Sequence, residues 1–110
     1  MSGPCVYIAG PMTGLPEFNY PAFRLAELDL IDAGHCVHNP VDIERHNPTP
    51  GTPQPWDWYM RHALRMVLDS GAVALLPGWE NSRGATLEHQ VATALGLDVR
   101  PLDGWLGGAS

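Results

Sequence analysis

The chain has 110 residues, of which 45% are hydrophobic and 16% are charged, a composition typical of one globular domain. Its net charge of -6, with only 6 Lys and Arg residues, argues against a surface that binds a nucleic acid polymer. No apolar run approaches the roughly 20 residues that span a membrane, and the N-terminus lacks the pattern of a signal peptide. We therefore expect a cytoplasmic protein that makes no membrane contact.

The sequence contains two cysteines, Cys5 and Cys36, near the starts of two predicted strands. We expect them to be reduced, because a core of this size needs no disulfide. The segment 35–38 holds two histidines and a cysteine but is too short to supply a closed zinc site by itself. We expect no metal and no redox cofactor.

Strand and helix patterns alternate through the first half of the chain. Residues 6–9 form a β-prone apolar run, residues 21–33 carry apolar side chains at helical spacing, and residues 36–38 suggest a short strand. Residues 41–55 contain closely spaced prolines, which predict a long irregular loop. Such a loop favours a lid or an interface segment.

The second half repeats the alternation. Apolar residues spaced as on one face of a helix begin at Trp56, which we expect to pack inward. The remaining predicted elements are a helix over 56–67, a strand over 72–76, a helix after 82, a strand over 97–99 and a loose, flexible tail over 104–110.

This order predicts an α/β fold: one domain over residues 1–103, built as a Rossmann- or flavodoxin-like three-layer sandwich around a parallel sheet of four to five strands. Ligands of such sheets bind beyond the carboxyl ends of the strands. The loops after residues 9 and 76 emerge there. We therefore expect Tyr7, Gly10 and Glu88 to share one crevice.

The segment from Leu76 to Glu88 joins a predicted strand to a predicted helix through a polar turn. Backbone N–H groups at such a helix start bind anions. Ser82, Arg83 and Gly84 are candidates for a phosphate clamp, since Arg offers a planar fork of donors. The simpler interpretations are that Ser82 caps the helix and Arg83 is a surface charge.

Three further side chains near this turn have two interpretations each. Tyr7 either packs in the core or orients a carboxylate on the neighbouring turn. Trp79 either stacks on a base or lies at the rim of the site, and Glu88 is either a solvated helix residue or a functional carboxylate. His89 follows Glu88 on the helix, and we expect it to face solvent or another subunit.

Two motifs resemble the DUF4406 family, a phage and bacterial domain of unknown function: YIAGPMTG at residues 7–14 and PGWENSRGATLEH at residues 77–89. The resemblance covers about residues 6–99. The family is similar to the nucleoside 2-deoxyribosyltransferase superfamily, which includes the 2'-deoxynucleoside 5'-monophosphate N-hydrolases.

The resemblance implies that Glu88 attacks the anomeric carbon of the sugar and that Tyr7 positions it. Ser82 and Gly84 match the arrangement of the monophosphate hydrolases, in which the serine contacts the 5'-phosphate. The first motif contributes the remaining expected substrate contacts, Gly10, Pro11 and Met12.

Three positions depart from the superfamily pattern. Ala63 stands where relatives carry an aspartate that helps to protonate or hold the base, and His62 or Asp57 is a possible substitute. Gly71 replaces another aspartate, and Thr13 replaces an arginine near the phosphate. Alanine cannot donate a proton, and the loss of such an acid typically costs about 10²–10⁴ in rate.

The leading hypothesis is an N-glycosidase-like hydrolase that acts on a (deoxy)nucleoside 5'-monophosphate through Glu88. The alternatives are a nucleotide-binding protein without turnover, a nucleoside 2-deoxyribosyltransferase, and a small interaction domain in which Glu88 is structural. The expected partners are a small nucleotide or nucleoside and further copies of the chain, most simply in a homodimer. The predicted helix over 56–67 and the apolar side chains of Leu102, Trp105 and Leu106 are candidate subunit contacts.

Overall fold

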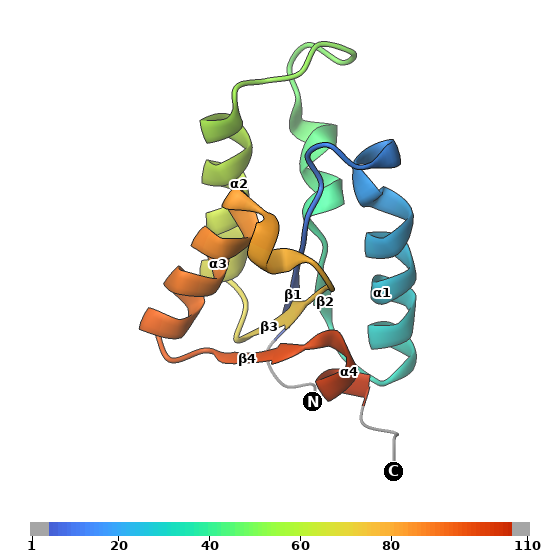
Figure 1. The fold of residues 1–110 in the computed structure, drawn as a ribbon, viewed down its shortest axis with the longest axis vertical. Helices are drawn as coiled ribbons and strands as arrows, with labels where there is room; N and C mark the ends of the chain where they lie inside the picture. Colours follow the sequence, from blue (N-terminus) through green and yellow to red (C-terminus); the bar gives the residue numbers. More distant parts are fainter. Residues whose placement is uncertain (1–4, 107–110) are drawn as a thin grey trace.

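The computed structural model describes residues 5–106, which fold around a four-stranded parallel sheet (Figure 1). The strands stand side by side in the order β2-β1-β3-β4, so the predicted α/β fold with a Rossmann- or flavodoxin-like sandwich is confirmed. The strands are β1 (Val6–Ala9), β2 (Val37–His38), β3 (Ala72–Leu75) and β4 (Asp98–Pro101). The α-helices are α1 (Tyr20–Asp32), α2 (Trp56–Leu68), α3 (Arg83–Ala94) and α4 (Leu102–Leu106), and the 3₁₀ helices are η1 (Pro16–Asn19), η2 (Pro40–His46) and η3 (Trp79–Asn81).

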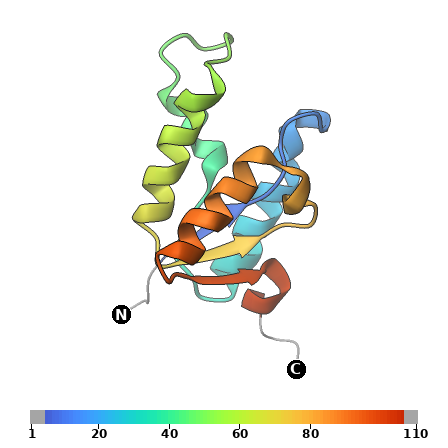
Figure 2. The same ribbon diagram turned by 60° about the vertical axis from the view of Figure 1, so that its left-hand side comes forward.

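Helices cover both faces of the sheet, as the ribbon views show (Figures 1 and 2). Val6 and Ile8 of β1 pack into the core under α1, whereas Tyr7 and Ala9 pack into the core under α2 and α3. This division follows from the period of two along a strand, which sends alternate side chains to opposite faces. The Tyr7 side chain therefore lies on the face of the sheet that α3 covers.

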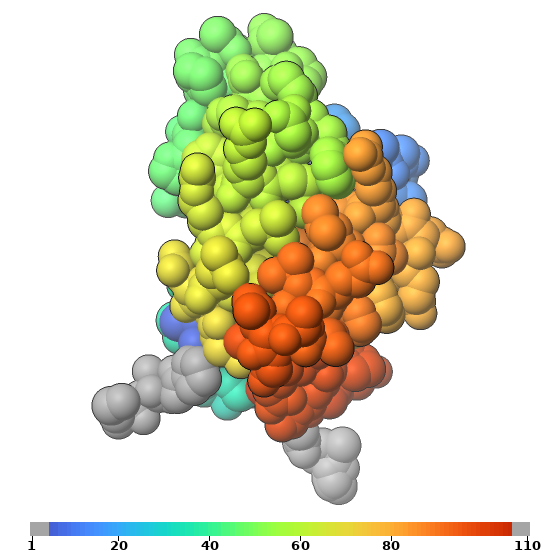
Figure 3. All heavy atoms as spheres, turned by 90° about the vertical axis from the view of Figure 1, so that its left-hand side faces the viewer, coloured from blue at the N-terminus to red at the C-terminus, as the bar shows by residue number. Residues whose placement is uncertain are grey.

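Parallel pairing brings the ends of β1 and β3 to the same edge of the sheet. Tyr7 lies in register with Val73, and Ala9 lies in register with Leu75. The chain segments that follow both strands consequently emerge together, which is where ligands of such sheets bind. In the space-filling view, α2 and α3 lie against each other on the face of the molecule that is turned to the viewer (Figure 3).

The prediction of an irregular loop over residues 41–55 is wrong for its first part, because η2 occupies Pro40–His46. The Asn39 side chain accepts a hydrogen bond from the Val41 N–H at 3.1 Å, and Pro40 opens the helix. These are ordinary helix start signals, and buried Val41 and Ile43 anchor the turn to the core. Only the part after His46 forms the long connection at the top of Figure 1.

The predicted tail over 104–110 is also wrong at its start, since residues 104–106 belong to α4. Residues 107–110 lie outside the described part of the chain. Leu102, Trp105 and Leu106 pack against the core under α1, and the Trp105 indole N–H donates to the Val73 carbonyl at 2.9 Å. These side chains thus pack within the subunit, and their role as subunit contacts stays a prediction.

The expectation of reduced cysteines is wrong as well: Cys5 and Cys36 form a disulfide, with their Cα atoms 4.5 Å apart. The residues directly precede β1 and β2, which are adjacent strands, and the Val6 N–H donates to the Cys36 carbonyl at 2.8 Å. Parallel pairing therefore fixes the two cysteines side by side within bonding distance. The sequence separation of 31 residues hides this proximity.

The His38 ring also lies next to this pair, so that ligand atoms of Cys5, Cys36 and His38 fall within 4.8 Å of one another. Cysteine binds a metal as a thiolate, and the two sulfurs of the disulfide are not thiolates. His38 instead shares a 2.8 Å hydrogen bond with the Ser70 hydroxyl. Across residues 5–106, no helix is long and apolar enough to cross a membrane.

Candidate functional site

A cavity of about 440 Å³ opens where the segments after β1, β2 and β3 meet, a size typical of small-molecule sites. Its walls come from the start of α3, from one face of α2, from η2 and from the segment between β1 and α1. The lining includes Tyr7, Gly10, Met12, Thr13, Tyr20, Glu44, Gly51, Thr52, Pro53, Trp56, Tyr59, Met60, Ala63, Ser82, Gly84 and Glu88.

A buried tyrosine–glutamate pair belongs to this lining. The Tyr7 hydroxyl donates a hydrogen bond to Glu88 Oε2 at 2.7 Å. Tyr7 is fully buried and Glu88 is 6% exposed. The two residues lie 81 positions apart in the sequence, so the parallel sheet is what brings them together. The expectation that Tyr7, Gly10 and Glu88 share a crevice is met.

The phase of α3 determines that Glu88 points inward. Ser82 caps the helix, its Oγ accepting from the Ala85 N–H at 3.1 Å, so the N-cap interpretation of Ser82 is confirmed. Ala85, Glu88 and Ala92 then share the buried side of α3, as their spacing of three and four requires. Glu88 is the polar member of an otherwise alanine-lined stripe.

Burial controls the protonation of this pair. Loss of hydration raises the pKa of Glu88 from its ordinary value of 4.5 to about 8, and the hydrogen bond from Tyr7 opposes that rise. Burial and the neighbouring carboxylate also raise the pKa of Tyr7 well above its ordinary value. Tyr7 therefore keeps its proton and remains a hydrogen-bond donor at neutral pH. The pKa of Glu88 lies close enough to neutral pH for its charge to change there.

The start of α3 has free backbone donors, and Ser82 and Gly84 of this segment line the cavity. Within residues 5–106, the Arg83 and Gly84 N–H groups have no hydrogen-bond acceptor, whereas those of Ala85 and Thr86 bond to Ser82. A Cβ on Gly84 would lie 3.1 Å from the sulfur of Met60, so the glycine permits α2 to approach closely. Unpaired N–H groups at a helix start attract anions.

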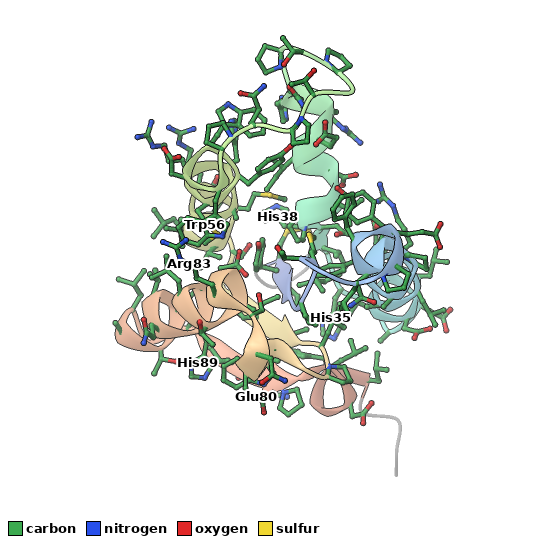
Figure 4. The ribbon with its side chains drawn as sticks, turned by 45° about the horizontal axis from the view of Figure 1, so that its top comes forward. His35, His38, Trp56, Glu80, Arg83 and His89 are labelled. Carbon is green, nitrogen blue, oxygen red and sulfur yellow. A yellow bond between two sulfur atoms is a disulfide. The ribbon has the colours of Figure 1, made fainter. Side chains whose placement is uncertain are left out.

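Three of the predicted substrate contacts lie outside the lining. The Arg83 guanidinium stacks on the Trp56 ring at 3.7 Å, and Trp79 stacks on His89 with centroids 4.4 Å apart. Figure 4 shows Arg83 beside Trp56 between α2 and α3, with His89 on the far side of α3. Pro11 instead neighbours Gly78, at 3.4 Å from where a Cβ of that glycine would lie.

Trp56 itself differs from the expectation. It is 37% exposed and does not pack fully inward, because it opens the helix at the cavity mouth and carries Arg83 on its face. The described lining contains no Lys or Arg, so Arg83 brings a positive charge to the rim through Trp56.

Gly10 provides the close approach between the segments after β1 and β3. A Cβ there would lie 2.8 Å from the Leu76 Cβ, closer than real Cβ contacts permit. The Leu76 N–H bonds to the Ala9 carbonyl at 2.8 Å, which locks the two segments together. Gly10 therefore shapes the floor of the site whether or not it contacts a ligand.

The residues proposed to replace a missing acid do not enter the cavity. Ala63 is buried and lines it, but His62 packs against Trp58 with the two rings tilted and their centroids 4.4 Å apart. Asp57 is exposed and lies 3.5 Å from Arg61. Neither side chain belongs to the lining.

A second carboxylate in the lining was missed in the sequence. Glu44 lines the cavity from η2, and it accepts a hydrogen bond from the Tyr59 hydroxyl at 2.9 Å. The signal was the capped turn that starts at Asn39-Pro40, which places Ile43 in the core and Glu44 beside it. The proline-rich segment that follows obscured this short helix.

Comparison with known families supports the sequence resemblance. The model of the family described as "Domain of unknown function (DUF4406)" matches residues 4–100. No curated protein matches the chain. The matched range contains β1 with Tyr7, the start of α3 and Glu88.

Proposed function

The chain belongs to the DUF4406 family, and we propose that it is an N-glycosidase-like hydrolase that cleaves the base–sugar bond of a (deoxy)nucleoside 5'-monophosphate. The observation that carries this proposal is the Tyr7–Glu88 pair: a carboxylate 6% exposed, held at 2.7 Å by a fully buried tyrosine, in the lining of a 440 Å³ cavity. Burying a carboxylate without a cation is costly, and such cost is usual at functional sites.

In the proposed reaction, ionised Glu88 attacks the anomeric carbon of the sugar. A carboxylate oxygen forms the new bond, the electrons of the C1'–N bond leave with the base, and the base takes a proton from water. A water molecule then attacks C1' and releases the Glu88 carboxylate, so two inversions give net retention. The carboxylate also stabilises the positive charge that develops on the sugar in the transition state.

Tyr7 acts as a positioning residue in this scheme. Its hydroxyl fixes Oε2 of Glu88 by a 2.7 Å hydrogen bond, which leaves Oε1 for the sugar. The same bond favours the ionised carboxylate and so opposes the rise of the Glu88 pKa through burial. The proposed nucleophile is thus both oriented and partly activated by one contact.

The start of α3 is the proposed phosphate site. The Ser82 hydroxyl keeps its own proton for donation while its oxygen accepts from Ala85. The N–H groups of Arg83 and Gly84 are free, and the Arg83 guanidinium reaches the rim over Trp56. Together these groups offer hydrogen bonds and positive charge on one side of Glu88.

A binding protein on the same scaffold is the second candidate, because Ala63 lines the cavity and supplies no proton. Such a protein would hold the nucleotide without turnover. The proposed hydrolase instead relies on water to protonate the departing base. A 2-deoxyribosyltransferase remains the third candidate and differs only in the acceptor that resolves the glycosyl-enzyme.

The discriminating experiment measures free base by chromatography after incubation with a panel of nucleosides and their 5'-monophosphates, in parallel with calorimetric binding. We expect release from monophosphates, and a loss of at least about 10³-fold in Glu88→Gln. Glu80→Gln is the matched control, because Glu80 is exposed and lies on the far side of α3 from α2 (Figure 4). Binding without release in the wild type would refute the hydrolase and favour the binder. Release only with an added second base would favour the transferase.

We also propose that the chain assembles as a homodimer through α1. Leu25, Leu28 and Ile31 are 52–63% exposed on this helix, and adjacent exposed apolar side chains are typical of protein contacts. Light scattering on the eluting protein should give a dimer mass that Leu28→Glu reduces to that of a monomer. A wild-type monomer at micromolar concentration would contradict this.

A further inference from the structure

We propose that Glu44 selects the base, and that the preferred base offers two adjacent N–H donors, as guanine does at N1 and its 2-amino group. This inference rests on the proposed function, since it identifies which nucleotide the same cavity takes. Glu44 lines the cavity from η2, while Glu88 and Ser82 line it from α3.

Two hydrogen bonds hold the Glu44 carboxylate in one orientation. The Tyr59 hydroxyl donates to Oε1 at 2.9 Å, and the Asn47 side-chain amide donates to Oε2 at 2.7 Å. Tyr59 is fixed in turn, because its oxygen accepts from the Gln54 N–H at 3.3 Å. A carboxylate at a flexible surface position would not be oriented through both oxygens.

Asn47 connects this carboxylate to the roof of the cavity. It is 6% exposed, and its amide also donates to the Thr52 carbonyl at 2.9 Å, while its oxygen accepts from the Thr49 N–H at 2.9 Å. Thr52 lines the cavity together with its neighbours in the loop. The loop and Glu44 are therefore positioned as one unit.

The contacts leave the Glu44 carboxylate with spare acceptor capacity. Both partners are donors, and within residues 5–106 Glu44 forms no salt bridge. An ionised carboxylate offers about four acceptor positions, of which the two contacts use one on each oxygen. One position on each oxygen remains, and in the proposed complex these two positions receive a pair of adjacent N–H donors.

The position of Glu44 suits the base and not the phosphate. The free N–H groups and Ser82 lie at the start of α3, which follows β3, whereas Glu44 lies on η2, which follows β2 on the other side of β1. Tyr59 contacts Glu44, and Tyr20 lines the same cavity, where burial and then the charge of Glu44 raise the pKa of Tyr20. Aromatic rings beside an acceptor pair are well suited to a flat, donor-bearing ring.

Base chemistry then ranks the candidates. Guanine presents N1–H and the 2-amino group side by side, so both can donate to Glu44. Hypoxanthine keeps N1–H but lacks the amino group, and thymine and uracil flank one N–H with two carbonyl oxygens that a carboxylate repels. Neutral adenine and cytosine place a lone pair beside their amino group, which also opposes a carboxylate.

The test compares kcat/KM for 2'-deoxyguanosine and 2'-deoxyinosine 5'-monophosphates, with the adenine, cytosine and thymine nucleotides as further substrates. We expect the guanine nucleotide to exceed the hypoxanthine one by about 10- to 100-fold, because hypoxanthine leaves one of the two half-buried Glu44 oxygens without its donor. Glu44→Gln should collapse this ratio towards unity, since its amide opposes one donor. The exposed-site control Glu80→Gln should leave the ratio unchanged.

An unchanged ratio in Glu44→Gln, or a preference for any base other than guanine, would overturn the inference while leaving the proposed hydrolase intact. If no nucleotide is cleaved, the proposed hydrolase fails and calorimetry decides the inference: tighter binding of the guanine nucleotide that Glu44→Gln abolishes supports it, and equal binding overturns it. If Glu44→Gln does not fold, Tyr59→Phe replaces it. This variant releases one carboxylate oxygen, and we expect it to reduce the ratio several-fold; an unchanged ratio would again overturn the inference.

Discussion

Replacement of Glu88 by Gln should make the protein more stable at alkaline pH, because the native environment of Glu88 disfavours its charge. The pKa of Glu88 is raised from 4.5 to about 8, chiefly by burial. Gln has nearly the same shape and stays neutral, and its carbonyl oxygen can still accept the hydrogen bond that Tyr7 donates to Oε2. The variant thus removes the ionisation and little else.

The magnitude follows from proton linkage. Between pH 4.5 and about 8 the folded protein keeps the Glu88 proton that the unfolded chain releases, so the unfolded state binds fewer protons and stability falls as pH rises. The slope is about 1.4 kcal/mol per pH unit for one proton. The stabilisation present below pH 4.5 is lost as pH rises through the native pKa, and the total loss is on the order of 5 kcal/mol.

The assay is urea unfolding followed by tryptophan fluorescence from pH 4 to 9, for the wild type and for Glu88→Gln. The difference in free energy of unfolding between the two proteins isolates Glu88, because the other titrating groups are common to both. We expect the free energy of unfolding of the variant, relative to that of the wild type, to rise steadily above pH 4.5 and to level off near pH 8. Glu80→Gln should follow the wild type. Parallel pH profiles for wild type and Glu88→Gln would refute the claim that burial holds this carboxyl in its neutral form.

Three further perturbations test other parts of the account. Tyr7→Phe removes the contact that lowers the pKa of Glu88, so the acid limb of the base-release profile should move upward by about one pH unit; an unmoved limb would contradict a positioning role. Reduction of the Cys5–Cys36 disulfide, which joins residues 31 apart, should cost about 3 kcal/mol in unfolding free energy. Thiol alkylation before and after reduction checks the pairing, and two alkylatable thiols without reduction would disprove it. Gly10→Ala places a Cβ 2.8 Å from that of Leu76 and should lower the free energy of unfolding by about 1–3 kcal/mol. An unchanged free energy of unfolding in urea would show that the segments after β1 and β3 move apart at little cost.

Local periodicity predicted the sheet and its main helices because these elements depend on short-range pattern. β1 and β3 are runs of four buried apolar residues, and α2 buries Met60, Ala63 and Val67 at helical spacing. The meeting of Tyr7 with Glu88 also followed, since parallel strands bring their carboxyl ends to one edge.

Contacts between distant segments were harder to predict. The disulfide depends on the neighbouring positions of β1 and β2, which their sequence separation of 31 residues does not reveal. The stacking of Trp79 on His89 and that of Arg83 on Trp56 both depend on side-chain rotamers that join residues of different elements. The spacing of residues along the chain does not reveal either contact. The sequence alone therefore could not show that Trp79 and Arg83 lie outside the cavity lining.

The short helices η2 and α4 were not predicted for a different reason. Composition over residues 41–55 is dominated by prolines after Asn47, and this hid the capped turn of η2 that carries Glu44. The helix α4 is five residues long and contains Gly104, so propensity alone does not predict it. Its formation depends on Trp105, whose indole bonds to the Val73 carbonyl of the sheet.

The stereochemistry of methanolysis tests the central claim most directly, because it reports whether a glycosyl-enzyme forms on Glu88. Added methanol would intercept that intermediate at C1' in competition with water and release the Glu88 carboxylate. We expect a methyl glycoside 5-phosphate in the β configuration of the nucleotide, identified by NMR of its anomeric proton, and we expect Glu88→Gln to abolish it. Formation of the α anomer would mean single displacement by the acceptor, and cleavage that survives Glu88→Gln would mean that another group performs the chemistry.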